Sequence, residues 1–204
     1  AVAYMLSVLD DDTLKHPALE CVITTDEEIG LLGAKALDTS VLKGTHMINM
    51  DSEEEGYLWI SCAGGLSGTS RIPVEYQEME GVVTEVLIDG LNGGHSGAEI
   101  DKNRANANKL MGLFLYELGQ KTAYSIKDLS GGTKDNAITR SCKATLVLGE
   151  EDLAEAKITA EKLQKDLRTE YAGSDEGITI SVITGKEETV QALSMVSKEK
   201  VVFY

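Results

Sequence analysis

The sequence contains no apolar run near the roughly 18 residues that a membrane-spanning helix needs. It also lacks a basic segment followed by an apolar stretch, which is the pattern of a secretory signal peptide. Its 19 Lys and Arg residues are scattered and are outnumbered by 34 Asp and Glu residues, so the formal net charge is -15. Such a charge repels the phosphates of nucleic acids. We therefore expect neither a membrane nor a nucleic acid as a partner.

Motifs for covalent catalysis, phosphate binding and structural zinc are also missing. No GxSxG nucleophile elbow is present, and the glycine-rich segment 131–136 lacks the GK[ST] ending of a phosphate loop, so it predicts a tight turn. The three cysteines, Cys21, Cys62 and Cys142, are widely spaced and form no CxxC pair. Each lies in a strand-like segment, which indicates buried free thiols in a cytoplasmic protein.

The first part of the chain alternates helical and strand-like patterns. Apolar residues at helical spacing predict helices over residues 1–9 and 29–37, and short apolar runs predict buried strands at 19–25, 47–50 and 57–62. Strands that alternate with helices through compact connections are typical of an α/β fold. We therefore expect a largely parallel sheet in this part.

The pattern changes at about residue 80 and keeps its new form to about residue 185. The order of its elements is βαββαβ, the ferredoxin-like arrangement. Strands are expected at 82–88, 123–129, 142–148 and 178–182, with helices at 103–118 and 153–167. The predicted fold class is therefore α/β, with a partial parallel-sheet domain followed by a ferredoxin-like domain.

Carboxylates follow two of the expected strands. Asp26, Glu27 and Glu28 come directly after the strand at 19–25, and Asp51 follows the strand at 47–50. Ligands of α/β sheets usually bind where the carboxyl ends of the strands meet, and carboxylate oxygens there suit a cation such as zinc. Two alternatives stay open. The triplet is also typical of an acidic helix N-terminus, and Asp51 of a solvated acidic turn.

His95 stands between glycines in the segment Gly-Gly-His-Ser-Gly, residues 93–97. Flanking glycines let the backbone approach a ligand and hold the histidine on a loop. The alternative is a structural or simply exposed histidine, which is the interpretation that we give to His16 and His46. A functional role for His95 is therefore a hypothesis of equal standing with a structural one.

Four stretches together resemble one family. They are TTDEEIGLLGAKAL, INMDSEEEGYLWISCAGG, LNGGHSGAEIDKNRANANKLM and SGGTKDNAITR, in that order along the chain. They look like successive motifs of the aminoacyl-histidine dipeptidases (Xaa-His dipeptidases, peptidase D), a group within the clan of dizinc dipeptidases, carboxypeptidases and aminoacylases. The resemblance covers essentially the whole chain.

The resemblance implies roles for individual residues of this sequence. Glu27 matches the general base of the family, and Glu28 and Asp51 match zinc ligands. His95 matches the histidine of the lid domain, which in dimeric relatives reaches the active site of the partner subunit and stabilises the oxyanion. Two further positions in the lid match residues that contact the substrate: Asn136 and Arg140.

The resemblance also implies an activity and a domain plan. The activity is the hydrolysis of Xaa-His dipeptides by water held between two zinc ions, in a cytoplasmic homodimer joined through the lid domain. The plan is a partial catalytic domain at 1–75, a lid and dimerisation domain at 76–186 and a segment at 187–204 that returns toward the catalytic domain.

The remaining histidine and aspartate ligands of the family would lie before Ala1 and after Tyr204. We therefore expect a central fragment of the enzyme that is inactive alone and binds zinc weakly. Two other functions stay open. One is a related zinc aminoacylase or deacylase, and the other is a noncatalytic dimerisation module with a ferredoxin-like fold.

Overall fold

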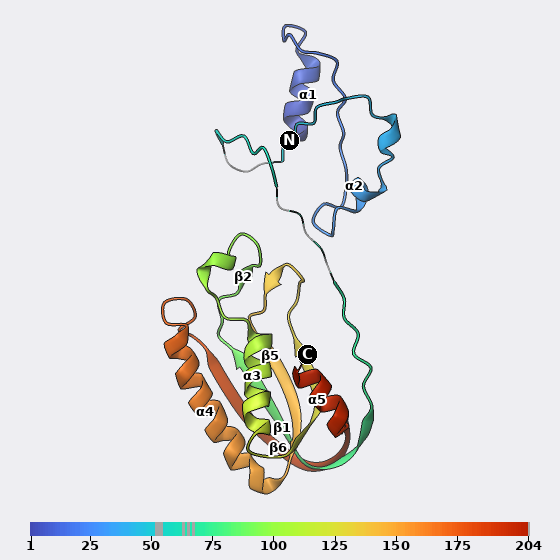
Figure 1. The fold of residues 1–204 in the computed structure, drawn as a ribbon. Coiled ribbons are helices and arrows are strands. Elements are labelled where there is room, and N and C mark those ends of the chain that lie inside the picture. The colour runs from blue at the N-terminus through green and yellow to red at the C-terminus, as the bar shows by residue number, and fades with distance from the viewer. Residues whose placement is uncertain (52–54, 63, 65, 67, 204) are drawn as a thin grey trace. The chain divides into compact units, whose positions relative to one another are not determined.

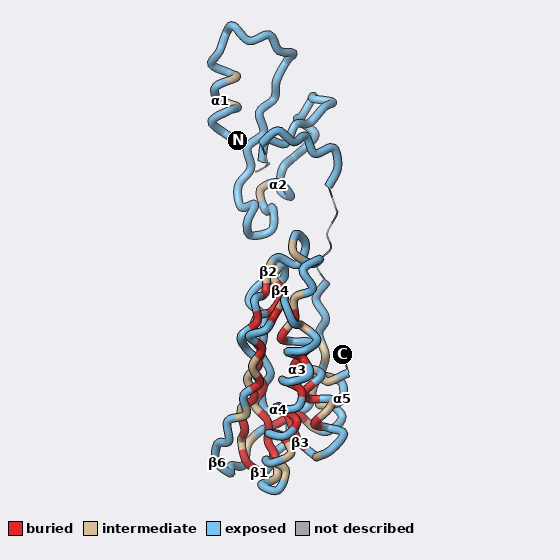
Figure 2. The backbone as a smooth tube through the Cα atoms, turned by 90° about the vertical axis from the view of Figure 1, so that its left-hand side faces the viewer, coloured by how far each residue is buried: buried red, intermediate tan, exposed pale blue. Residues whose placement is uncertain are grey.

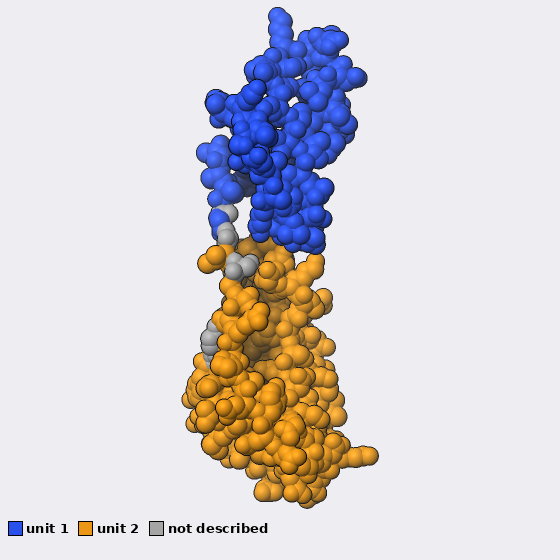
Figure 3. Space-filling model, turned by 90° about the vertical axis from the view of Figure 1, so that its right-hand side faces the viewer, with its two compact units in different colours: residues 1–64 blue, residues 65–204 orange. Residues whose placement is uncertain are grey.

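The computed structural model describes residues 1–51, 55–62, 64, 66 and 68–203. The chain divides into two compact units, residues 1–64 and residues 65–204 (Figure 3). Among the described residues, every buried one belongs to the second unit (Figure 2). No helix in the described part of the chain is long and apolar enough to cross a membrane.

The second unit is a four-stranded antiparallel sheet with two long helices on one face (Figure 1). The strands lie in the order β3-β5-β1-β6. In chain order the elements are β1 (Tyr76–Asp89), α3 (Ala107–Gly119), β3 (Tyr124–Gly131), β5 (Cys142–Leu148), α4 (Leu153–Glu170) and β6 (Thr179–Leu193). The order βαββαβ and this strand order confirm the ferredoxin-like prediction.

The core of this unit lies between the sheet and the helices, because both contribute apolar side chains at the spacing that faces inward. Alternate residues of β1, such as Val86 and Ile88, are fully buried. Helix α3 covers them with side chains one helical turn apart, including Met111 and Phe114. Helix α4 adds Ala156, Ala160, Leu163 and Leu167. A helix of nine residues, α5 (Met195–Phe203), packs beside α3, where the rings of Tyr116 and Phe203 meet edge to face.

Strands β1 and β6 are both longer than the sequence pattern predicted. β1 begins at Tyr76 rather than at residue 82, and β6 continues to Leu193 rather than ending near residue 182. The added halves pair with each other, from Tyr76 opposite Leu193 to Gly81 opposite Glu188. Their side chains are mostly exposed and polar, so no alternation of apolar residues marked them as strands.

The parallel sheet expected in the first unit is not formed. Its described residues adopt α1 (Val2–Asp10), α2 (Leu32–Ala36) and a short 3-10 helix at Thr39–Val41, with no strand among them. A strand needs hydrogen-bonded neighbours and a surface that covers its apolar face. Neither is present here, since Ile48 in one expected strand is 83% exposed and Ile60 in another is 98% exposed.

The expectation of three buried thiols holds for one cysteine only. Cys142 is buried in β5, and burial raises the pKa of its thiol to about 11. Cys21 and Cys62 are exposed, so the prediction was wrong for them. The physical reason is that the strands expected to bury these two side chains are not formed in residues 1–64.

Candidate functional site

Within the connection between β1 and α3, the loop at residues 92–105 carries the GGHSG motif. Its short strand β2 (Gly94–His95) pairs with β4 (Ala137–Ile138), and His95 lies opposite Ala137. The backbone N–H of Ser96 donates to the carbonyl of Asn136 at 2.9 Å. The structure therefore brings His95 beside Asn136, although the two motifs are far apart in the sequence. Both residues are exposed.

Arg140 follows β4 and bonds back to the segment just after β1. Its Nε donates to the carbonyl oxygen of Leu91 at 3.2 Å. This contact joins the segment after β4 to the start of the loop at residues 92–105. Three positions singled out from the sequence, His95, Asn136 and Arg140, thus belong to two segments that are bonded to each other at both ends.

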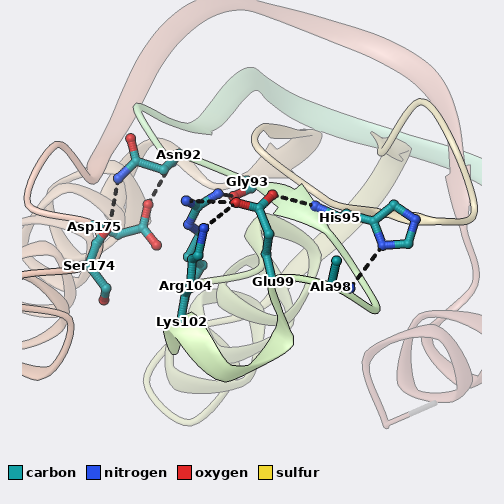
Figure 4. Close-up of polar contacts among 9 residues, drawn as sticks. All are labelled: Asn92, Gly93, His95, Ala98, Glu99, Lys102, Arg104, Ser174 and Asp175. Carbon is teal, nitrogen blue, oxygen red and sulfur yellow. Dashed lines mark hydrogen bonds and ion pairs between the residues drawn. The ribbon is translucent and has the colours of Figure 1, made fainter. Parts of the chain in front are cut away.

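The His95 ring is held by the turn that follows it (Figure 4). Its Nδ1 accepts hydrogen bonds from the backbone N–H groups of Gly97 at 3.0 Å and Ala98 at 3.1 Å. This is the geometry of a helix N-cap, in which a side chain satisfies donors two and three residues ahead. A Cβ at Gly97 would lie 3.3 Å from ring atoms of His95, so the glycine lets the ring lie close to the backbone.

Glu99 is the centre of the charged contacts in the loop. Its Oε2 accepts a hydrogen bond from the backbone N–H of His95 at 2.9 Å, and its Oε1 lies 2.7 Å from Lys102 Nζ and 3.2 Å from Arg104 Nη2. The hydrogen bond from Lys102, followed by that from the His95 backbone, lowers the pKa of Glu99 to about 2. Glu99 is therefore ionised throughout the neutral range.

Gly94 must be a glycine for this arrangement to exist. Its φ is +146°, a conformation that residues with a side chain rarely adopt. A Cβ there would lie 2.7 Å from Glu99 Oε2, inside the van der Waals limit. The glycine therefore makes room for the carboxylate that holds His95.

Asp175, in the connection between α4 and β6, ties the two ends of the loop together. Its carboxylate is completely buried. Oδ1 accepts from the backbone N–H of Asn92 at 2.6 Å, and Oδ2 accepts from that of Ala105 at 2.7 Å. Asn92 reinforces this contact by donating its side-chain N–H to the carbonyl of Ser174 at 2.6 Å. A buried carboxylate is tolerated here because both oxygens have donors.

Sequence reasoning missed Glu99, Arg104 and Asp175. Glu99 and Arg104 lie within the LNGGHSGAEIDKNRANANKLM stretch, so their nearness to His95 was a usable signal. Asp175 gave no signal, because it stands 83 residues from Asn92 and 70 from Ala105 along the chain. Only the packing of the α4–β6 connection against the loop reveals its role.

The carboxylates of the first unit lie in local turns. Glu27 and Glu28 belong to a turn that leads into α2, where the carbonyl of Glu27 accepts from the N–H groups of Gly30 and Leu31 at 3.1 and 3.0 Å. The backbone N–H of Asp51 donates to Asn49 Oδ1 at 2.9 Å. The acidic turn expected after Asp51 falls largely on residues 52–54, which are outside the described part of the chain.

A complete zinc site is not assembled by the described residues. Carboxylates such as those of Glu28 and Asp51 have the donor chemistry that zinc accepts, but a protein zinc site needs three or four protein ligands. Among the residues that the structure describes, no group of three or more His, Cys, Asp and Glu side chains is placed to hold a metal ion. The potential ligands among these described residues therefore do not fit a full site by themselves.

Comparisons with known proteins give a consistent picture. Residues 88–175 match the model of the M20 peptidase dimerisation domain. The chain is 35% identical over 181 residues to the cytosol non-specific dipeptidase of Escherichia coli strain K12, covering 88% of this chain and 37% of that protein. It is 27% identical over 177 residues to the uncharacterized protein YqjE of Bacillus subtilis strain 168, covering 84% and 43%.

Among solved structures, the aminoacylhistidine dipeptidase of Vibrio alginolyticus matches with a TM-score of 0.73 and 27% identity. The match covers 99% of this chain and 41% of that one. The chain thus spans less than half the length of the relatives that it matches.

Replacing Asp175 by Ala tests whether this carboxylate holds the loop. We expect the free energy of unfolding to fall, because each buried N–H left without an acceptor costs about 1–3 kcal/mol. We also expect faster hydrogen exchange at the amides of Asn92 and Ala105, measured by NMR. The control is Glu176→Ala at the exposed neighbour, whose carboxylate accepts the N–H of Gly173 at 3.2 Å, and it should leave exchange at the Asn92 and Ala105 amides unchanged. Unchanged exchange at both amides in Asp175→Ala would contradict the assignment.

Proposed function

We propose that the whole protein hydrolyses dipeptides of the Xaa-His type. Two findings support this proposal. The chain matches an aminoacylhistidine dipeptidase along almost its whole length, and it carries a peptidase dimerisation domain. The observation that carries the proposal is the 35% identity with a dipeptidase over 181 residues. That length is about twice the matched domain at 88–175, so the relationship reaches beyond a module for dimerisation.

For the first unit we propose that Glu28 and Asp51 are two of the ligands of a dizinc centre in the whole protein. Carboxylates at such a centre fit zinc, and bound zinc would supply a water molecule with a lowered pKa. Glu27 would accept the proton of this water and deliver it to the leaving amine. The support is the match of TTDEEIGLL and INMDSEEEG to the family motifs. The 204 residues alone would then be inactive.

For the second unit we propose that His95 stabilises the oxyanion and that Asn136 and Arg140 contact the substrate. The contact between β2 and β4 supports this, because it places His95 beside Asn136 on exposed backbone. We further propose a cytoplasmic homodimer joined through this unit. The domain plan of catalytic residues 1–75, lid residues 76–186 and return segment 187–204 is part of the same proposal.

A zinc titration by calorimetry tests the division of the ligands between this chain and the rest of the protein. We expect weak binding or none by the 204-residue chain, because fewer than three ligands converge in its described residues. A protein of the relatives' full length that contains this chain should bind two zinc ions tightly. Tight stoichiometric binding by the 204-residue chain would overturn this part of the proposal.

Glu27→Gln in the same full-length protein tests the general base. We expect turnover of an Xaa-His dipeptide to fall by about 100- to 10,000-fold, which is the usual contribution of a positioned base. Bound zinc, measured by elemental analysis, should be retained. Glu28→Gln is the matched variant, and it should lose zinc as well as turnover. The assignment of Glu27 fails if its variant keeps wild-type turnover.

His95→Asn separates a catalytic role from a structural one. Asn is a good N-cap, so its side chain should still satisfy the N–H groups of Gly97 and Ala98 and keep the turn folded. It does not reproduce the outer N–H of the imidazole. We expect turnover of the full-length protein to fall by about 100- to 1,000-fold, as when an oxyanion donor is removed. Full activity in this variant would mean that His95 acts as a cap alone.

A further inference from the structure

The two backbone donors at the His95 ring fix which ring nitrogen carries the proton. Both Gly97 and Ala98 aim an N–H at Nδ1, so this nitrogen must present a lone pair. A neutral imidazole has one N–H, which must then be on Nε2. The other ring nitrogen points away from the turn in Figure 4. The turn thus selects the form in which His95 presents a hydrogen-bond donor outward.

The ring keeps this position only while the backbone of His95 stays in place. Glu99 Oε2 accepts the His95 backbone N–H at 2.9 Å, from the side opposite to the ring (Figure 4). The carboxylate is itself held by two cations, Lys102 and Arg104, through its other oxygen. Arg104 also donates to the carbonyl of Gly93. One group of charged side chains therefore fixes the backbone on both sides of Gly94.

We propose that Glu99 is a positioning residue for His95. Its carboxylate fixes the backbone of His95 so that the turn at Gly97 and Ala98 holds the imidazole as the Nε2–H tautomer. The outward N–H is then a preorganised donor for an anionic oxygen. The use of this donor in turnover rests on the proposed dipeptidase function, whereas the tautomer and its dependence on Glu99 do not.

His16 offers an internal contrast in the same chain. Its Nδ1 lies 2.7 Å from the carbonyl oxygen of Pro17. A carbonyl only accepts, so Nδ1 of His16 must donate and carry the proton. The two histidines are thus expected to show opposite tautomers when both are neutral.

Long-range proton–nitrogen correlation NMR of the 204-residue chain, labelled with 15N at histidine and kept above pH 7.5, measures these tautomers directly. The His95 signals are identified by their loss in His95→Asn. We expect Nδ1 of His95 at the chemical shift of an unprotonated ring nitrogen and Nε2 at that of a protonated one. The same chain in urea gives the tautomer mixture of an unrestrained histidine.

Glu99→Ala should move both His95 nitrogen shifts toward the values of the urea-unfolded chain. Glu99→Gln, which preserves side-chain shape, should move them less and in the same direction. Asp101→Ala is the matched control, because it removes an exposed carboxylate of the same loop that makes none of the contacts described around His95, and it should leave the shifts unchanged. The proposal is overturned if His95 is protonated on Nδ1, or if both Glu99 variants keep the wild-type shifts.

Turnover in the full-length protein then tests the use of this donor. We expect Glu99→Ala to lower kcat by about 10- to 100-fold, because the donor is misplaced, with little change in KM. A shift in the His95 tautomer with unchanged kcat would uphold the tautomer and overturn the part in which His95 acts in turnover. Unchanged shifts with an inactive His95→Asn variant would overturn the role of Glu99 and leave the proposed function standing.

Discussion

Strand β1 is hydrogen-bonded along both edges, to β5 on one side and to β6 on the other, and the second unit is built around it. Because β1 is central, its pairing with β5 and β6 fixes the position of Asp89, where the chain leaves the sheet. The loop that carries His95 begins there and returns to the core at α3. Buried side chains of β1, such as Val86 and Ile88, lie under α3 and keep these two anchoring points at a fixed separation.

Most residues of the loop at 92–105 are exposed, and polar contacts give it its shape. Asp175 holds its ends through backbone donors, and Glu99 holds its middle. The two carboxylates work in different surroundings. Asp175 is fully buried and is stabilised by hydrogen bonds, whereas Glu99 is partly exposed and is stabilised by Lys102 and Arg104. A loop tied at its ends and centre holds a side chain more firmly than one tied at its ends alone.

The first unit differs in kind from the second. Glu27 and Glu28 lie in a turn closed by backbone hydrogen bonds, and the described residues of this unit have no buried core. Metal ligands from such turns are brought together only when the strands that carry them are paired. The relatives are more than twice as long as this chain, and the proposed zinc centre belongs to a protein of that length.

The sequence by itself determined the ferredoxin-like unit, and it predicted a site in the GGHSG loop. The helices and the strand at Cys142–Leu148 follow from apolar spacing, which is a local property of the chain. Two glycines of this loop have a structural reason in the fold, since Gly94 makes room for the Glu99 carboxylate and Gly97 for the His95 ring. The strand patterns at 19–25 and 47–50 were not sufficient, because pairing needs a partner that a local pattern does not supply.

Only the tertiary structure decided the contacts that shape the candidate site. The far halves of β1 and β6 are polar, and their pairing depends on register rather than on alternation. The bonds from Asp175 to Asn92 and Ala105 join residues 83 and 70 positions apart. The orientation of the His95 ring depends on where two backbone N–H groups point. The sequence shows which residues are present. The orientation of their side chains and N–H groups is set only when the sheet, the helices and the loop pack together.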